Sequence, residues 1–206
     1  YDPSTDNFTS SITSGASSAG LIFLGSDNVT GTYSSMWGGN SPSNGCIGPG
    51  AVSTYSAILP TGTASFKIQK IFTSSTSFTE KFSYYSDSSC STSTGYIKFG
   101  FTNLIVNPAS VTVIALSPRP GTAYRIQYSR LNVISKGKTP AVVSFLYTFL
   151  GRTHSLNVEQ TNPSSGTMYN IFATGTAGSL TLLFIGSESS STYPPGWQSS
   201  DDVSYK

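Results

Sequence analysis

The chain has few of the residues on which catalysis and metal binding usually depend. Its 206 residues include one histidine, two cysteines and two methionines, and only 10% of them are charged. A zinc site of the usual cysteine and histidine kind would need all three of those side chains and a carboxylate as well. We therefore expect neither a metal site nor a cofactor.

The charge of the chain is also low and evenly divided. Eleven Lys and Arg residues stand against nine Asp and Glu, which gives a formal net charge of +2. The basic residues are scattered and form no stripe that could follow the phosphates of a nucleic acid. No stretch approaches the ~18 consecutive apolar residues of a transmembrane helix. These absences argue against a nucleic-acid partner and against a membrane-spanning helix.

Hydroxyl and aromatic side chains are abundant instead. Ser and Thr make up roughly 30% of the chain, well above their usual share. Twelve Phe, twelve Tyr and two Trp are too many apolar rings for a chain that stays unfolded. The composition is typical of a secreted, extracellular or cell-surface β protein.

Apolar and polar side chains alternate in short segments, and helical periodicity is almost absent. Gly, Pro, Asn or Ser residues bound each segment, as they bound strands. The sequence predicts an all-β, antiparallel fold with less than about 10% helix, either an up-and-down barrel of about ten strands or a β-sandwich. The expected strands include 66–69, 78–84, 96–101, 124–129, 143–149, 156–158, 169–171 and 180–184.

The chain reads as one domain, 1–206, with a Ser/Thr-rich segment over about 1–19 and a polar tail over about 187–206. Segment 135–140 is short enough for a hairpin connection between two strands. Segments 20–26 and 182–187 resemble each other in apolar composition. Either this is coincidence, or both occupy edge positions through which copies of the chain could add strands to one another.

Several aromatic side chains share the inward phase of their strands, because alternate side chains of a barrel strand point inward. Glu80 is in phase with Phe78 and Phe82 and is the one acid expected to face inward, whereas Glu188 and Asp202 fall in loops and ends. The hypothesis is that the rings line one cavity, although such rings could equally fill a closed core. The candidate ligand-lining residues are Phe66, Phe78, Phe82, Tyr84, Phe99, Phe101, Tyr124 and Tyr128.

His154 is the only candidate base for nucleophilic catalysis. No Gly-x-Ser-x-Gly motif, which would expose a nucleophilic serine, accompanies it. We interpret it as a surface or hydrogen-bonded histidine and expect no catalytic residues, so the chain is not predicted to be an enzyme.

Cys46 and Cys90 both stand beside turn-rich polar runs. If paired, they would close a loop of about 45 residues and stabilise the fold by ~4 kcal/mol in the loop-entropy model. We expect this disulfide from the secreted composition, the alternative being two free thiols in a reducing compartment. Asn7 and Asn28 begin N-glycosylation sequons, which also favour secretion. The start of the chain is read as the end left after removal of a signal peptide.

Three segments resemble a known family. They are 31–35, ahead of Cys46; 84–90, which reads Tyr-Tyr-Ser-Asp-Ser-Ser-Cys; and 94–100, which ends in Gly. Over about residues 31–134, and more weakly over 179–206, the chain is similar to the APCDD1 domain, a lipocalin-like extracellular β-barrel. Tyr33 stands where that family has Trp. The resemblance implies a barrel with a hydrophobic pocket for an acyl chain; the family's association with lipid-modified Wnt ligands does not transfer.

Two functions from different classes follow as hypotheses. The first is a secreted, non-catalytic, lipocalin-like barrel that binds an apolar ligand such as a lipid or an acyl chain. The second is a structural component of an extracellular coat, filament or matrix, joined to other copies or to extracellular protein partners through its terminal segments. An enzyme or a lectin is less favoured. An unfilled apolar interior above ~300 Å³ favours the first hypothesis.

Overall fold

The computed structural model describes residues 23–36, 45–115, 118–198 and 202–206. It is all-β, which confirms the predicted fold class, with helix over 12% of the chain and therefore above the expected share. The strands are β1 (Phe23–Leu24), β2 (Asp27–Asn28), β3 (Gly31–Ser35), β4 (Ser65–Ser74), β5 (Ser77–Tyr85), β6 (Ser93–Thr112), β7 (Thr122–Gly137), β8 (Glu159–Pro163), β9 (Thr167–Ala177), β10 (Leu180–Ile185) and β11 (Asp202–Tyr205). The helices are α1 (Pro49–Thr54), the 3-10 turn η2 (Ser56–Ile58) and α2 (Pro140–Leu150).

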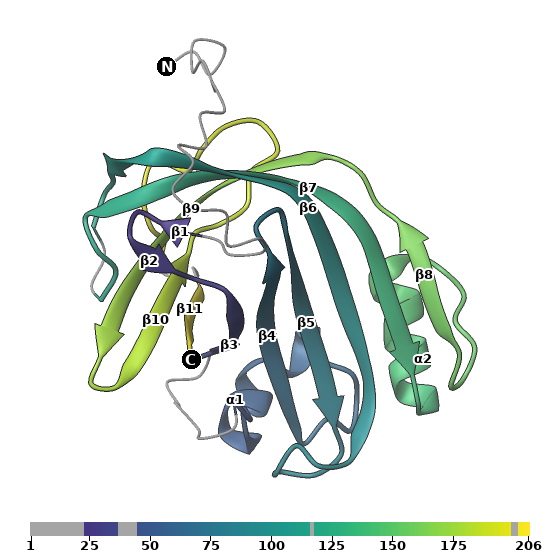
Figure 1. The fold of residues 1–206 in the computed structure, drawn as a ribbon. Helices are drawn as coiled ribbons and strands as arrows, with labels where there is room; N and C mark the ends of the chain where they lie inside the picture. The colour runs from purple at the N-terminus through teal and green to yellow at the C-terminus, as the bar shows by residue number, and fades with distance from the viewer. Residues whose placement is uncertain (1–22, 37–44, 116–117, 199–201) are drawn as a thin grey trace.

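Eight strands close into a ring (Figure 1). Its order is β3-β4-β5-β6-β7-β9-β10-β11, and β11 pairs back onto β3. Successive strands of the ring are neighbours and all pairings are antiparallel, so the predicted up-and-down connectivity is confirmed. β8 stands outside the ring, where it extends the sheet beside the second half of β7.

The seams of this ring differ greatly in length. β6 and β7 are joined through thirteen residue pairs, interrupted by three register shifts. β11 and β3 are joined through two, Ser204 with Ser35 and Tyr205 with Ser34. The closing seam therefore has the fewest backbone hydrogen bonds to hold it.

The expected strand at 143–149 is wrong, because residues 140–150 form helix α2. Pro140 is in the first turn, the Thr139 side chain accepts a hydrogen bond from the Val142 backbone N–H, and Gly151 ends the helix with a φ of 66°. The expected hairpin at 135–140 is wrong for the same reason, since β7 runs to Gly137 and leads into the helix. Residues 156–158 are an exposed turn and not a strand.

The resemblance between segments 20–26 and 182–187 does not mark two edge strands. β10 pairs with β9 on one side and with β11 on the other, inside the ring. Part of the segment predicted as a polar tail forms β11 and completes the ring.

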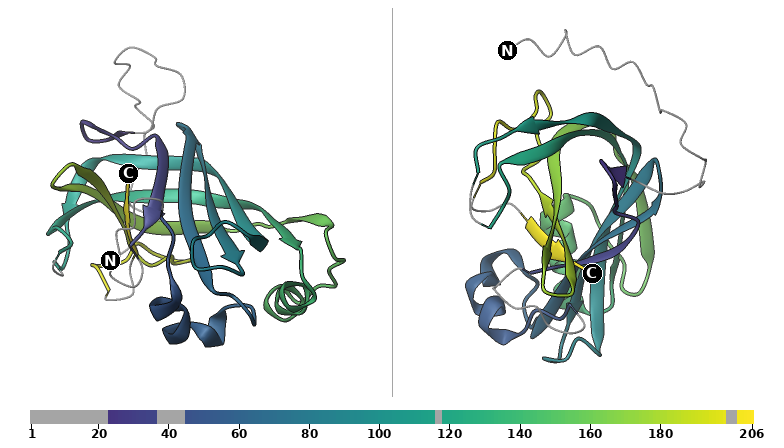
Figure 2. Two further views of the ribbon diagram at one scale, coloured as in Figure 1. Left: turned by 90° about the horizontal axis from the view of Figure 1, so that it is seen from below. Right: turned by 60° about the vertical axis from the view of Figure 1, so that its left-hand side comes forward.

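Cys46 and Cys90 form the predicted disulfide, with their Cα atoms 5.8 Å apart. It joins the segment before α1 to the turn between β5 and β6. Ile47 next to it pairs with Phe66 at the start of β4. The bridge therefore fixes the segment leading into α1 against the end of the ring at which both helices lie (Figures 1 and 2).

The predicted inward phases are confirmed. Phe78, Phe82 and Tyr84 face the interior from β5, and Tyr124, Ile126 and Tyr128 face it from β7. The interior holds two clusters. One packs around Phe78 and Phe101, and the other lies beneath α1 and α2, around Phe66 and Ile97.

Candidate functional site

The interior contains an apolar cavity of about 360 Å³ at the end of the ring where the helices lie. Strands β4, β5 and β6 form its wall, while η2 and α2 flank its mouth. Two residues at this mouth, Ile58 and Phe149, are more than half exposed, so the cavity reaches solvent between the two helical segments. The lining residues are Ile58, Leu59, Phe66, Ile68, Glu80, Phe82, Tyr84, Ile97, Phe99, Phe101, Arg130, Phe145, Phe149 and Glu188.

Helix α2 lines the outer side of the cavity with side chains from one of its faces. Val142 and Leu146, four residues apart, are buried against the barrel. Phe145 and Phe149 lie on the next stripe, with stacked rings 5.5 Å apart, and Phe145 also meets Tyr84 edge-on at 5.6 Å. Residues four apart share one face of a helix, so both rings can line the same space.

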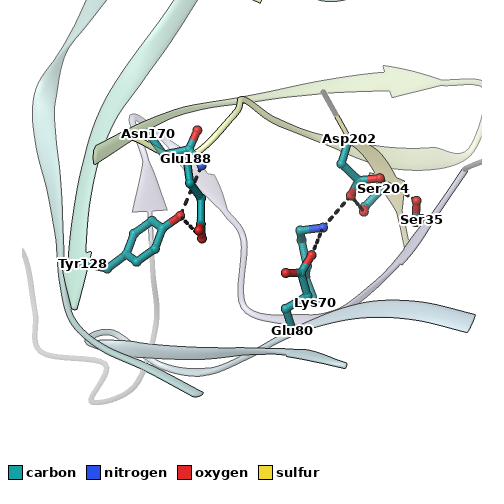
Figure 3. A network of polar contacts seen from close by, with 8 residues as sticks. All are labelled: Ser35, Lys70, Glu80, Tyr128, Asn170, Glu188, Asp202 and Ser204. Carbon is teal, nitrogen blue, oxygen red and sulfur yellow. Dashed lines mark hydrogen bonds and ion pairs between the residues drawn. The ribbon is translucent and has the colours of Figure 1, made fainter. Parts of the chain in front are cut away.

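A smaller polar pocket of about 160 Å³ lies beside the apolar cavity, and Glu80 and Glu188 line both. Figure 3 shows the polar contacts among the side chains around it. Lys70 on β4 is its central cation. The Lys70 ammonium lies 2.8 Å from Glu80 Oε1 and 2.7 Å from Asp202 Oδ2. Asp202 also accepts hydrogen bonds from the Ser35 and Ser204 hydroxyls. This network links β4, β5, β3 and β11, so it spans the seam that closes the ring.

Charge pairing outweighs burial in this network. Burial alone would lower the pKa of Lys70, but attraction to Asp202 and then Glu80 raises it above the ordinary value. Burial alone would raise the pKa of Asp202, but the neighbouring Lys70 ammonium lowers it below the ordinary value. Both groups are therefore charged at neutral pH.

A second chain of polar contacts ends at Glu188. The buried Asn170 side chain donates to the Tyr128 hydroxyl at 3.2 Å, and that hydroxyl donates to Glu188 Oε1 at 2.8 Å. Arg130 donates to Glu188 Oε2 at 2.9 Å. Burial, followed by the charge of Glu188, raises the pKa of Tyr128 well above its ordinary value, so the phenol keeps its proton.

The structure divides the predicted lining residues between these spaces. Phe66, Phe82, Tyr84, Phe99 and Phe101 line the apolar cavity, while Phe78 and Tyr128 line the polar pocket. Tyr124 lines neither and packs against the cluster around Phe78. Glu80 faces inward as predicted. The expectation that it is the one inward acid is wrong, because Glu188 and Asp202 line the polar pocket too.

Some of the lining residues that sequence reasoning missed carried a usable signal. Lys70 is in phase with Ile68 and Phe72, so its inward direction was readable, and it pairs directly with Glu80 across the hairpin. Phe145 and Phe149 were assigned to a strand, although Thr139 and Pro140 before them form a helix start signal. Asp202 and Glu188 carried no such signal, because closure of the ring positions them.

His154 is buried and hydrogen-bonded. Its Nδ1–H donates to the Arg152 carbonyl oxygen at 2.8 Å, and its Nε2 lies at hydrogen-bond distance, 2.8 Å, from the Ser135 hydroxyl. Ser135 has no exposed surface, so its hydroxyl does not reach a substrate in solvent. Among the described residues, no group of three His, Cys, Asp or Glu side chains could hold a metal ion. No helix in the described parts of the chain is long and apolar enough to cross a membrane.

The two sequons differ in what the structure describes. Asn28 is exposed on β2, where its side-chain oxygen accepts a hydrogen bond from the Thr30 backbone N–H at 2.8 Å. Asn7 lies outside the described residues.

No family model matches the chain, and a search of curated proteins finds no relative. The resemblance to lipocalin-like domains therefore remains a prediction that depends on the motifs.

Proposed function

We propose that the chain is a secreted, non-catalytic, lipocalin-like barrel that binds an apolar ligand, such as a lipid or an acyl chain, inside its ring. The observation that supports the proposal is the cavity of about 360 Å³ with its mostly apolar lining. Binding pockets for small molecules span about 300–1,000 Å³ and are lined mainly by hydrophobic and aromatic groups. A barrel filled by its own rings would be close-packed and leave no such space.

Secretion is supported by the Cys46–Cys90 disulfide, since such bonds persist in oxidising compartments. The exposed Asn28 sequon would accept a glycan there.

The alternative, a structural component joined through its terminal segments, loses one of its supports. One ground for that hypothesis was an edge position for segment 182–187, and β10 is paired on both sides. Self-association is therefore kept as an outcome of the test.

The test is a titration with N-phenyl-naphthylamine, an uncharged dye whose fluorescence rises in apolar surroundings. We expect saturable binding to the wild type and strong loss of binding in Ile68→Trp, because the indole would occupy the cavity that Ile68 lines. Ile114→Trp is the matched control, since Ile114 is exposed and lies outside the cavity. Thermal unfolding of all three proteins checks that each is folded.

Absence of dye binding to the wild type would contradict the proposal, and light scattering that found large assemblies would then favour the structural alternative. Equal binding to Ile68→Trp and wild type would place the dye elsewhere and also count against the cavity.

A further inference from the structure

The apolar cavity has a polar end, and the charges at this end are unequal. Glu80 and Glu188 stand where the apolar cavity and the polar pocket share a wall. Two cations, Lys70 and Arg130, and three carboxylates, Glu80, Glu188 and Asp202, line the two spaces together. Two positive and three negative charges leave one negative charge in excess. A ligand head entering this end therefore meets a net negative wall.

The hydrogen bonds show which carboxylate carries the excess. Both oxygens of Asp202 accept from its neighbours, as do both oxygens of Glu188. Glu80 Oε1 accepts from Lys70, whereas no group in the described part of the chain donates to Glu80 Oε2. A carboxylate oxygen in a partly enclosed site favours a donor as its partner, and a charged donor most of all.

The cations at this end are already engaged. Lys70 is held between Glu80 and Asp202, and Arg130 is paired with Glu188. A carboxylate head could reach the remaining N–H groups of Arg130, but it would lie beside Glu188 and Glu80. The carboxylate head and these two carboxylates would repel each other, and the low polarity of the cavity would strengthen the repulsion.

We propose that the cavity selects amphiphiles with a cationic, hydrogen-bond-donating head, such as an alkylammonium, which pairs with Glu80 Oε2 while the apolar chain lies among Phe82, Phe99 and Phe145. This inference rests on the proposed function and adds the chemical class of the ligand. An alcohol of equal length would donate one hydrogen bond without the charge. A fatty acid would add another negative charge to a wall that already has one in excess.

The test compares three competitors that differ only in the head group: decylamine, decanol and decanoate. Each displaces N-phenyl-naphthylamine from the wild-type protein at neutral pH and at low salt. We expect decylamine to bind about tenfold more tightly than decanol, which is the size of one charge-assisted hydrogen bond, and decanoate to bind most weakly. Added salt should reduce the preference for the amine, because ions screen a partly exposed pair.

Glu80→Gln should bring decylamine and decanol to within about threefold of each other, because the charge is lost and the shape is kept. Glu159→Gln is the matched control. Glu159 is an exposed carboxylate that accepts from Tyr96 and lines neither space, so its variant should keep the wild-type order. Arg130→Gln is a second variant, at a more exposed position, in case Glu80→Gln does not fold. It should strengthen decylamine binding, since it leaves the wall more negative.

The outcomes separate this inference from the proposed function. Dye that no competitor displaces, or that does not bind, would contradict the cavity itself. Equal affinity for all three competitors, or decanoate binding more tightly than decanol, would overturn the inference and leave a carrier of apolar ligands. Loss of decanoate binding in Arg130→Gln, with decylamine unchanged, would also overturn it, because Arg130 would then be the head-group partner.

Discussion

Aromatic side chains point inward in both halves of the barrel interior, but they pack differently in each half. In one half, Phe78 stacks on Phe101 with ring centroids 4.5 Å apart and meets Tyr128 edge-on at 5.0 Å. In the other half, Phe82 and Phe99 are 6.0 Å apart and only partly buried. The comparison teaches that inward phase fixes the direction of a ring, whereas the number of facing strands decides whether the space fills.

The physical reason lies in what faces each ring. Phe72, Phe101, Tyr128 and Phe172 reach Phe78 from four different strands, so rings meet rings across the packed half. Opposite Phe82 and Phe99, the cavity is flanked by η2 and α2, which lie at the mouth. The hollow half is therefore open to solvent.

The largest expected effect on stability comes from a substitution in the packed half. Phe78→Ala should lower the free energy of unfolding by about 3–5 kcal/mol, because it removes a buried ring and leaves a void that its neighbours cannot fill. Urea unfolding followed by tryptophan fluorescence measures this loss. A loss below about 1 kcal/mol would show that this half is not close-packed.

Lys70 lies between the two halves. Lys70→Met should lower the free energy of unfolding by a similar amount, about 3 kcal/mol. The change leaves Glu80 and Asp202 without their shared cation at neutral pH. The wild-type contribution of Asp202, whose pKa is lowered on folding, is present above its ordinary pKa of 3.8 and is lost as the pH falls through the folded value. The stability difference between wild type and variant should therefore be largest near neutral pH and shrink below about pH 4.

Unfolding curves of the wild type and of Lys70→Met, recorded between about pH 3 and neutral pH, measure this stability difference. A difference that stays constant down to acid pH would mean that Lys70 acts through packing and not through charge.

Phe82→Ala sharpens the comparison with Phe78. Because Phe82 is only partly buried, whereas Phe78 is buried, its loss should cost less than about 2 kcal/mol. Dye affinity should fall several-fold. Parallel unfolding and dye titrations of the two alanine variants check this. A stability loss equal to that of Phe78→Ala, without an effect on binding, would show that the hollow half behaves as a core.

The smallest stability effect is expected at the mouth of the cavity. Phe149→Ser should change the free energy of unfolding by less than about 0.5 kcal/mol, since the ring is 57% exposed. Dye should bind more weakly, because one side of the mouth is lost. Tyr147→Ser is the matched control on the same helix, exposed to a similar degree and outside the cavity lining. Equal dye binding by the two variants would show that Phe149 does not contribute to the site.

The fold class was predictable because alternation is a local property of each strand. The inward direction of Phe78, Phe82 and Tyr128 followed from phase within single strands. Lys70 and Glu80 could have been paired in the same way, since the hairpin between β4 and β5 places them directly opposite each other.

Helix α2 was mistaken for a strand because residues 143–149 alternate in composition as well. Its buried residues, Val142 and Leu146, follow the helical spacing of four, and the caps at Thr139 and Gly151 decide between the two patterns.

Contacts made by closure of the ring could not be predicted. Asp202 and Lys70 are 132 positions apart in the sequence, and no local pattern predicts a contact between residues so far apart. The split of the interior into a packed and a hollow half has the same origin, because it depends on which strands face each other across the ring.

The position of β11 in the chain has a consequence for biosynthesis. The strand that closes the ring is the last of the eight in sequence and holds β3 through two residue pairs. While the ribosome extends the chain, β3 and β10 each present an unpaired edge, and such edges recruit strands from other chains. Asp202 enters with this strand, so its ion pair with Lys70 adds to the two residue pairs that hold the ring closed.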